Sequence, residues 1–574
     1  MNIYDNAFTR DHHLMLRISR WIHRPVFGFL AIVLPLLAIA GGGMEARAAS
    51  WGGVLSQGAL EESDPGYAAP ESRRDPTFPI RKFDIVGSTL YPGEILDEVL
   101  REFLGTGRTA DDVEQSRALL ERFFQETGYV RVLVNIPEQE VEHGIVKLEV
   151  TESRIGNVVV TGNRYFTRET ILTALPSLQP GKILYVPDVE KELNDLNKTP
   201  DLTVRLGLQP SRELGVDDVE LKVEDRLPLH ARLELSNRST HDTSGLRFNG
   251  MLRFDNLWQA GHSISVQYQT APEEPEEVQV LGTSYLMPVP WQKKHMLATY
   301  GLWTDSDTAF GDGFSVSGKG FIVGLRYLVP LPPLEKYYHT VSFGLDYKDF
   351  DETIGFAGEA DSNSESPISY LPFAAEYNGT YLDDGGTTRL KAALNWSFRG
   401  LVGKQEEFAN KRLYAQADYM YLRLGLGRSQ KLPWGMLLDI ETEGQVASGP
   451  LISSEQFSAG GMESVRGYKE SDSLGDDGGR ASVEWRMPDL GKATGAGTWL
   501  RLDPYLFYAL AWLDVQQPQQ GQTDEFFLSG AGAGLRGSLW TALEYQADMA
   551  WALSGTDRTD AGDTRYHFLV KYLF

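Results

Sequence analysis

Twelve residues near the middle of a long connection read Phe457-Ser458-Ala459-Gly460-Gly461-Met462-Glu463-Ser464-Val465-Arg466-Gly467-Tyr468. The connection is rich in Gly and Asp and runs from about Ala447 to Arg480. A connection of this length without secondary structure of its own is usually functional or disordered. Its apolar residues need a surface to pack on, and its glycines permit sharp turns and close approach to a wall. We therefore expect a folded loop that carries Arg466 as a lone cation, which would need a carboxylate partner inside a barrel.

The segments on both sides of this connection alternate between apolar and polar residues from Leu227 onward. The clearest runs are Ile264, Val266 and Tyr268 against Ser263, Ser265 and Gln267; Leu438 and Ile440 against Asp439 and Glu441; and Leu413, Ala415, Ala417, Tyr419 and Tyr421 against Gln416 and Asp418. A period of two directs one face of a strand to lipid and the other to a polar lumen. A soluble β-sandwich also alternates, but carboxylates opposite long apolar runs favour a membrane barrel.

The final strand strengthens this interpretation. Tyr566, Phe568, Val570, Tyr572 and Phe574 alternate up to the C-terminus, and a terminal aromatic strand of this form is typical of outer-membrane barrels. We predict a transmembrane β-barrel of about 16 antiparallel strands over residues 227–574, with both ends on the periplasmic side. Eleven of these strands precede the Val465–Tyr468 motif and five follow it. Phe568, Tyr572 and Phe574 are the candidate barrel-assembly signal.

The N-terminal residues 1–48 predict a secretory signal peptide, with a basic leader, an apolar run and the small-x-small site Ala46-Arg47-Ala48. A single transmembrane anchor is the alternative, but the apolar run is short and Pro35 interrupts it. The leader is long, so that Met15 competes with Met1 as the start. Residues 49–78 are rich in Pro, Ser, Glu and Gly and predict a linker.

Two copies of a small α+β unit are predicted over residues 79–153 and 154–226. Ile85-Val86-Gly87 recurs as Val160-Thr161-Gly162, and the run that ends in Glu152 recurs as the run that ends in Asp225. Helical patterns such as Asp111–Thr127 lie between these anchors. Each copy is expected to form a strand, two helices and two strands.

Composition excludes several classes of function. A formal net charge of -25 would repel nucleic acid. The chain has no Cys, so that disulfides and thiolate zinc sites are ruled out. No nucleophile elbow, phosphate-binding loop or zinc-protease helix is present, and we predict neither catalytic residues nor a cofactor. Asp305-Ser306-Asp307 and Asp472–Asp477 hint at calcium, but neither completes a calcium loop; we interpret both as solvated acidic loops and predict no metal site.

Two further motifs carry a resemblance to a known family. The run Val465-Arg466-Gly467-Tyr468, and Tyr129-Val130-Arg131-Val132-Leu133-Val134-Asn135-Ile136-Pro137-Glu138-Gln139 in the first repeat, resemble the two-partner secretion transporters. These are the TpsB class of haemolysin secretion/activation proteins (ShlB/FhaC/HecB type), within the superfamily of POTRA domains followed by a barrel. The resemblance covers roughly residues 79–574 and implies that both repeats are POTRA domains, the first of the ShlB type.

The resemblance also implies site residues. The loop at 447–480 would fold back into the barrel lumen, where its Arg meets an Asp on the wall. The family's Asp-containing signature aligns with Phe507–Ala511, but this chain has Ala509 and Ala511 in place of the Asp and Gly. Candidate substitute partners for Arg466 are Asp439, Glu441 and Glu484. The family has a plug helix near the linker, for which Trp51–Leu60 is a weak candidate.

The function implied by the resemblance is transport. POTRA domains would capture an unfolded secreted exoprotein, such as a TpsA-like adhesin or haemolysin, by adding an extended strand to an exposed sheet edge. The candidate contacts are Val132, Val134, Ile136, Pro137 and Gln139. Other expected partners are outer-membrane lipid, the barrel-assembly machinery and periplasmic chaperones. An insertase of the same superfamily is the alternative, and a solute porin is a third, although porins lack POTRA repeats.

Overall fold

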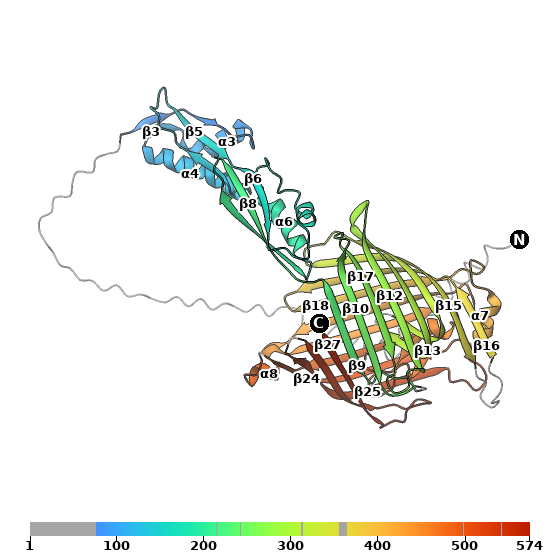
Figure 1. The fold of residues 1–574 in the computed structure, drawn as a ribbon. Coiled ribbons are helices and arrows are strands. Elements are labelled where there is room, and N and C mark those ends of the chain that lie inside the picture. Colours follow the sequence, from blue (N-terminus) through green and yellow to red (C-terminus); the bar gives the residue numbers. More distant parts are fainter. Residues whose placement is uncertain are drawn as a thin grey trace, which may run out of the picture. The chain divides into compact units, whose positions relative to one another are not determined.

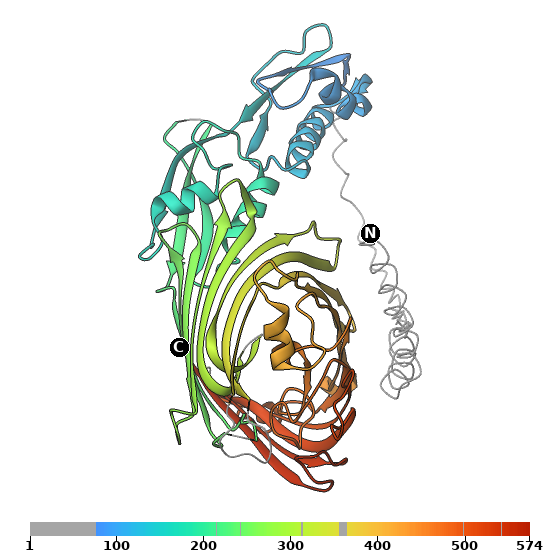
Figure 2. The same cartoon turned by 90° about the vertical axis from the view of Figure 1, so that its right-hand side faces the viewer.

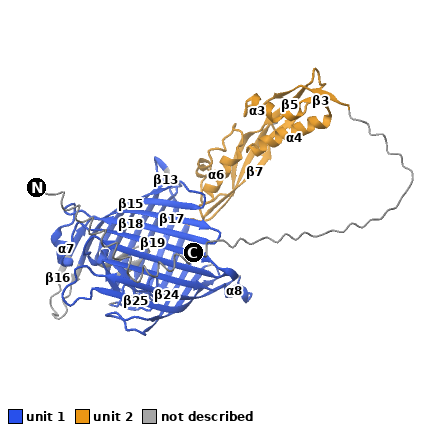
Figure 3. Ribbon diagram, turned by 180° about the vertical axis from the view of Figure 1, so that it is seen from behind, with its two compact units in different colours: residues 1–45, 229–574 blue, residues 46–228 orange. Residues whose placement is uncertain are grey.

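The computed structural model describes residues 76–574 except 214, 242, 312–313, 355–363, 498 and 541. The predicted signal peptide and the candidate plug helix lie outside the described residues. The predicted linker, 49–78, lies outside them up to residue 75, and its last residue, Phe78, begins a strand. Two compact units divide the chain after Pro228, and Figure 3 distinguishes them by colour. Among the described residues, no helix has the length and hydropathy needed to cross a membrane.

The unit that ends at Pro228 contains two modules of the same design. In the first, β2 (Lys82–Val86), β5 (Ile145–Glu152) and β4 (Val132–Asn135) form a sheet in the order β2-β5-β4. Its helices are α3 (Gly93–Val99), η1 (Arg101–Phe103) and α4 (Ala110–Glu126). A separate pair, β1 (Phe78–Ile80) with β3 (Gly105–Arg108), has no counterpart in the second module.

The second module has β6 (Arg154–Thr161), β8 (Val216–Asp225) and β7 (Leu202–Pro210) in the order β6-β8-β7, with α5 (Arg168–Ala174) and α6 (Val186–Leu196). Each module has its own apolar core. Arg131 of the first module pairs with Asp217 of the second at 2.6 Å, which joins the two cores within one unit.

The repeated sequence anchors have a physical explanation. Gly87 and Gly162 follow the first strand of each module at φ +94 and +86, and a Cβ there would lie 2.3 and 2.4 Å from a carbonyl oxygen of the last strand. The repeated acid accepts the backbone N–H groups freed by this turn: Glu152 bonds Thr89 and Leu90, and Asp225 bonds Arg164, Tyr165 and Phe166. In each module the glycine allows the tight turn after the strand, and the acid accepts the N–H groups that the turn leaves without backbone partners.

A substitution pair tests this explanation. Gly162→Ala should destabilise the second module by more than about 2 kcal/mol, because it adds a backbone clash to a strained conformation. Gly181 has the same φ of +86 with nothing within 4 Å of an added Cβ, so Gly181→Ala should cost only about 1 kcal/mol. Hydrogen exchange of residues 154–225 in the full chain measures both, and equal losses would show that close packing at Gly162 contributes nothing.

The second unit is a closed antiparallel barrel (Figure 1). Its strands are β9 (Leu229–Ser236), β10 (Arg247–Leu257), β11 (His262–Thr270), β12 (Val278–Val289), β13 (Gln292–Gly311), β14 (Phe314–Pro330), β15 (Tyr337–Ile354), β16 (Ser364–Tyr370), β17 (Phe373–Asp383), β18 (Gly386–Trp396), β19 (Met420–Lys431), β20 (Leu437–Ala447), β23 (Asp477–Arg486), β24 (Leu500–Asp514), β25 (Glu525–Leu539), β26 (Leu543–Ala552) and β27 (Thr564–Leu573). β16 and β17 pair with successive parts of β15 and form one strand interrupted at Leu371–Pro372. The seventeen segments therefore make sixteen strands, eleven before the connection that follows β20 and five after it, which confirms the predicted barrel.

One predicted strand was placed too early. The alternation from Leu413 to Tyr421 predicted a strand, but β19 begins only at Met420. Residues 397–419 form a connection that contains α7 (Gln405–Lys411). This helix lies at the end of the barrel in Figure 1 and within the ring of strands in Figure 2. Ala415, Ala417 and Tyr419 are buried in a cluster with Phe408 of α7, so their period of two reflects packing inside the connection.

Candidate functional site

The central feature of the lumen is the connection between β20 and β23, residues 448–476, which we call the lumen loop. It begins with η3 (Ser453–Glu455), and β21 (Phe457–Ala459) pairs with β22 (Ser473–Gly475) to form a short hairpin stem. The tip, residues 460–472, contacts the wall made by β23 to β27. Val465 and Tyr468 of the tip are completely buried. The loop is thus a packed element and not a solvated one.

Arg466 at the tip contacts carboxylates from two wall strands. Its Nη2 lies 3.0 Å from Oε2 of Glu484 on β23, and its Nε lies 3.3 Å from Oδ2 of Asp548 on β26. Nε also donates to the Met462 carbonyl at 3.0 Å, within the loop. The guanidinium lies 4.2 Å from the Phe507 ring centroid, which adds a cation–π contact.

Arg536 and Tyr505 complete the charge cluster around Arg466. Arg536 pairs with Glu484 at 2.7 Å and lies 4.3 Å from the Tyr505 ring centroid. The Tyr505 hydroxyl donates to Asp548, whose side chain has no solvent exposure. Arg486 also pairs with Glu484, at 3.3 Å. Each buried carboxylate of the cluster therefore has a cationic partner, as low-dielectric surroundings require.

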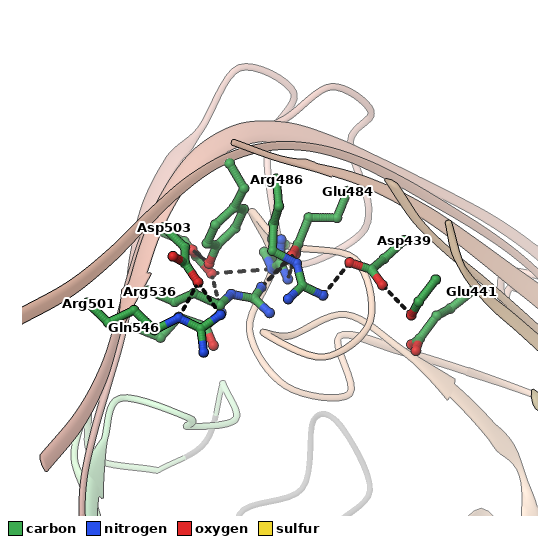
Figure 4. Close-up of polar contacts among 12 residues, drawn as sticks. Asp439, Glu441, Glu484, Arg486, Arg501, Asp503, Arg536 and Gln546 are labelled. Carbon is green, nitrogen blue, oxygen red and sulfur yellow. Dashed lines mark hydrogen bonds and ion pairs between the residues drawn. The ribbon is translucent and has the colours of Figure 1, made fainter. Parts of the chain in front are cut away.

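The three predicted partners of Arg466 have different environments. Only Glu484 contacts Arg466. Asp439 instead bonds Arg486 and Ser429, and Glu441 pairs with Arg389 at 2.9 Å. Figure 4 shows this row of polar side chains along the wall.

Asp548 was missed by the sequence prediction. It lies on β26 in a run where Glu544, Gln546 and Asp548 alternate with apolar residues. That run has the same period-two signal that selected Asp439 and Glu441. The signal was present, but nothing in the sequence brings β26 next to the loop tip.

Ala509, where the family pattern has Asp, lies in an apolar patch under the loop tip. It is buried in one cluster with Val465, Tyr468, Ala511 and Leu528. The carboxylates lie on the strands around it: Glu484 is level with Phe507, and Asp548 and Tyr505 are both level with Gly534. The carboxylate partners of Arg466 therefore lie on β23, next to β24, and on β26, two strands away from it.

Glycines of β25 make room for this arrangement. A Cβ at Gly530 would lie 2.0 Å from the Arg466 carbonyl oxygen, and one at Gly534 would lie 2.4 Å from the Tyr505 ring. Gly467 of the tip approaches β26 so closely that a Cβ would lie 2.9 Å from the Ala552 nitrogen. The loop tip can therefore approach the wall this closely only because these three positions are glycines and carry no side chain.

Backbone and hydroxyl groups fasten the tip further. The Gly467 N–H donates to His567 Nε2 on β27 at 3.2 Å. The Tyr468 hydroxyl lies 2.6 Å from the Ser554 carbonyl oxygen and 3.0 Å from that of Ser529. Each of Val465, Arg466, Gly467 and Tyr468 therefore has a specific contact with the barrel.

The stem of the loop is fastened to the opposite wall. Glu455 pairs with Lys348 of β15 at 2.7 Å and accepts the hydroxyls of Tyr370 and Tyr421 at 2.7 and 2.9 Å. Burial raises the pKa of Glu455, but Lys348 and the two hydroxyl donors more than offset it and hold the pKa below its usual value. Glu455 is therefore an ionised anchor within an aromatic cluster.

The predicted solvated character of residues 472–477 is wrong. Asp472, Asp476 and Asp477 are buried. Asp476 pairs with Arg412 of the α7 connection at 2.5 Å and accepts the Leu451 and Gln516 N–H groups at 2.8 and 2.7 Å. Asp476 and these partners, which we call the outer cluster, join the α7 connection, the lumen loop and the connection after β24. Donors from the protein thus satisfy the Asp476 carboxylate. At the other acidic stretch, Asp305 pairs with Lys319 at 3.0 Å.

The space beside the loop is lined by paired charges. Two cavities of about 350 and 650 Å³ lie between the loop and the wall. Arg389, Lys391, Glu443 and Arg480 are among the wall residues that line the smaller one. Their ion pairs, and others on the same face, are Arg326–Asp346, Lys391–Glu376, Arg389–Glu441, Arg480–Glu443 and Arg501–Asp503. The loop narrows the lumen without filling it.

The predicted client contacts lie in the first module, mostly in its core. Val132 and Val134 are each 1% exposed. The Val134 N–H and carbonyl bond the side chains of Glu121 and Arg117, which closes this strand edge at that point.

The rest of the predicted set continues past β4. Ile136 and Pro137 are half-buried. Gln139 bonds both the N–H and the carbonyl of Lys147 at 2.7 and 2.8 Å, like an added strand residue. The Val132 and Val134 side chains are thus held in the core, and the Val134 backbone groups already have side-chain partners.

Comparisons with known proteins agree with this architecture. A family described as haemolysin secretion/activation protein ShlB/FhaC/HecB matches residues 215–537, and the ShlB-type POTRA domain matches residues 78–153. The outer membrane transporter CdiB of Dickeya dadantii is 23% identical over 465 residues, which are 74% of this chain and 76% of the relative. The heme/hemopexin transporter protein HuxB of Haemophilus influenzae is 19% identical over 471 residues, 80% of each chain.

Solved structures show the same fold. CdiB from Escherichia coli superposes with a TM-score of 0.58 at 16% identity, over 89% of this chain and 93% of that one. BamA from Haemophilus ducreyi without POTRA domains 1–3 gives a TM-score of 0.53 at 14% identity, over 87% and 100%. Both are similar in fold to this chain.

Proposed function

The chain belongs to the haemolysin secretion/activation family ShlB/FhaC/HecB, an outer-membrane transporter family of two-partner secretion, and on this premise we propose how its own residues perform transport. The POTRA modules receive an unfolded exoprotein in the periplasm. The barrel conducts it outward beside or in place of the lumen loop. Arg466 and Glu455 hold that loop in the resting state.

The observation that carries this proposal is the polar attachment of the lumen loop. Arg466 and Glu455 make ion pairs with the wall at two places, and Asp476 pairs with Arg412 of the α7 connection. Such contacts are directional and can be exchanged for water or for a polar client, whereas a continuous apolar interface cannot. A loop held in this way is suited to leaving the lumen and returning to it.

The client is an exoprotein of the TpsA type, and we propose a large adhesin or haemolysin. No nucleotide is available in the periplasm, so that folding of the client outside the cell supplies the driving force. Assembly of the barrel itself would involve periplasmic chaperones and the barrel-assembly machinery, which would recognise the C-terminal strand through Phe568, Tyr572 and Phe574.

A deletion strain tests the proposal. Loss of one large protein from the culture supernatant, with other outer-membrane barrels unchanged, is the expected result. A general fall in outer-membrane barrels without a specific secretion defect would instead identify an insertase. The fold similarity to BamA alone does not favour the insertase, because the family that matches is the transporter family.

A further inference from the structure

The seam at which the barrel closes is short. Within the described residues, β27 and β9 share five register pairs, compared with eight for β9 and β10 and nine for β26 and β27. β9 ends at Ser236, level with Leu569. The outer half of β27 therefore extends beyond its neighbour.

Asn237 takes the place of the missing strand. Its Oδ1 accepts the Phe568 N–H at 2.9 Å, and its Nδ2 donates to the Tyr566 carbonyl at 2.7 Å. A side-chain amide thus continues the ladder outward by one residue. Whatever holds Asn237 in position also holds this part of the seam closed.

The residues that follow Asn237 contact the lumen loop. Arg238 pairs with Glu463 at 2.8 Å and with Glu470 at 3.3 Å. The Ser239 carbonyl accepts the Glu470 N–H at 3.1 Å, and His241 bonds Asp472 at 2.7 Å. Four polar contacts therefore join residues 238–241 to the outer half of the loop tip.

The residues 237–241, which we call the coupling segment, lie between the seam and the loop. Consecutive Cα atoms are about 3.8 Å apart, so that Arg238 cannot move far without displacing Asn237. Ser239 and Thr240 are buried, which leaves the segment little freedom to absorb such a movement. The Gly467 contact with His567 adds a second link between the loop and β27.

We propose that the coupling segment makes closure of the β27–β9 seam depend on the lumen loop. Arg238 is then a positioning residue: it holds the loop in the lumen on one side and Asn237 against β27 on the other. When the loop leaves the lumen, the outer half of the seam loosens. The consequence for transport rests on the proposed function, but the coupling itself does not.

Hydrogen exchange of the full chain in detergent micelles tests the coupling directly. Arg238→Ala removes contacts with the loop alone and leaves Asn237 intact. We expect it to accelerate exchange in residues 564–568 by roughly tenfold. Asn237→Ala should have the same effect, because it removes both side-chain bonds to β27 and leaves only the Asn237 N–H bond to the Phe568 carbonyl. Arg399→Ala, which removes the exposed pair of Arg399 with Asp418 in another outer connection, should leave these residues unchanged.

The outcome that would contradict the coupling is an effect on the loop without an effect on the seam. Faster exchange confined to residues 461–472 in Arg238→Ala, with 564–568 still protected, would overturn the proposal. If Arg238→Ala does not assemble, His241→Ala removes the contact with Asp472 and provides the same comparison. Because the readout is exchange, the coupling can fail while secretion is normal, and the proposed function can fail while the coupling holds.

Discussion

Replacing Arg466 by Ala is expected to reduce secretion to below about a tenth of the parental level while the barrel still assembles. The substitution leaves Glu484 paired with Arg536 and Arg486, but it removes the guanidinium that pairs with Asp548. Asp548 has no solvent exposure, and breaking a buried pair costs about 3–5 kcal/mol. The bond to the Met462 carbonyl and the contact with the Phe507 ring are lost as well. The tip should therefore leave the wall.

The matched control is a double variant that removes a carboxylate together with the Arg466 cation. Asp548→Asn added to Arg466→Ala removes the unpaired carboxylate, so the double variant should dock its loop better than the single variant. Arg466→Lys keeps the charge but not the two-sided geometry, and should secrete at an intermediate level. Secretion of a tagged client measures transport, and protease accessibility of residues 460–472 measures docking. Parental secretion by Arg466→Ala would remove the loop tip from the mechanism.

Replacing Asp476 by Ala is expected to open the outer mouth of the barrel. The carboxylate is buried and joins Arg412, Leu451 and Gln516, one from each of three connections. Its loss leaves the Leu451 and Gln516 N–H groups without their acceptor, and the Arg412 guanidinium keeps only two carbonyl partners and no counter-ion. A cost of about 3–5 kcal/mol would raise the ratio of open to closed molecules by two to nearly four orders of magnitude, roughly 10²–10⁴.

Single-channel conductance in planar bilayers measures this opening, and sensitivity of cells to a large antibiotic reports it in vivo. Arg399→Ala is the control, because the Arg399–Asp418 pair lies in the same connection as Arg412 with both side chains partly exposed. Exposed pairs contribute only about 0–1 kcal/mol. Equal conductance of the Asp476 and Arg399 variants would mean that the outer cluster does not close the mouth.

The barrel was predictable because its signal is local. Each strand has its own alternation of apolar and polar residues, and the aromatic C-terminal strand identifies the last strand of the barrel. The POTRA repeats were predictable because the duplication is visible in the sequence itself: Gly162 and Asp225, which meet at one turn although they are far apart in the sequence, recur at matching positions as Gly87 and Glu152. Such features require no knowledge of which distant segments meet.

Features that depend on distant contacts were not predictable. Asp548 on β26 lies near Glu484 on β23 only because the two strands between them, β24 and β25, pair in a particular register. Asp476 was interpreted as solvated because its buried partners come from connections on both sides of it in the sequence. The alternation at Ala415 and Ala417 has the period of a strand, but it results from packing beneath α7. Val132 and Val134 alternate as a strand should, yet the sequence does not say which face is the core.

The paired charges along the barrel wall have a kinetic consequence for a chain in motion. An extended polypeptide passing Arg326–Asp346 and Arg480–Glu443 meets each cation beside an anion. Opposite charges at such short separation cancel within a few ångströms, so the wall has no deep electrostatic minimum of either sign. A translocating segment would therefore slide with little friction whether it is acidic or basic. Its speed would be set by the folding that pulls it from outside and not by release from the wall.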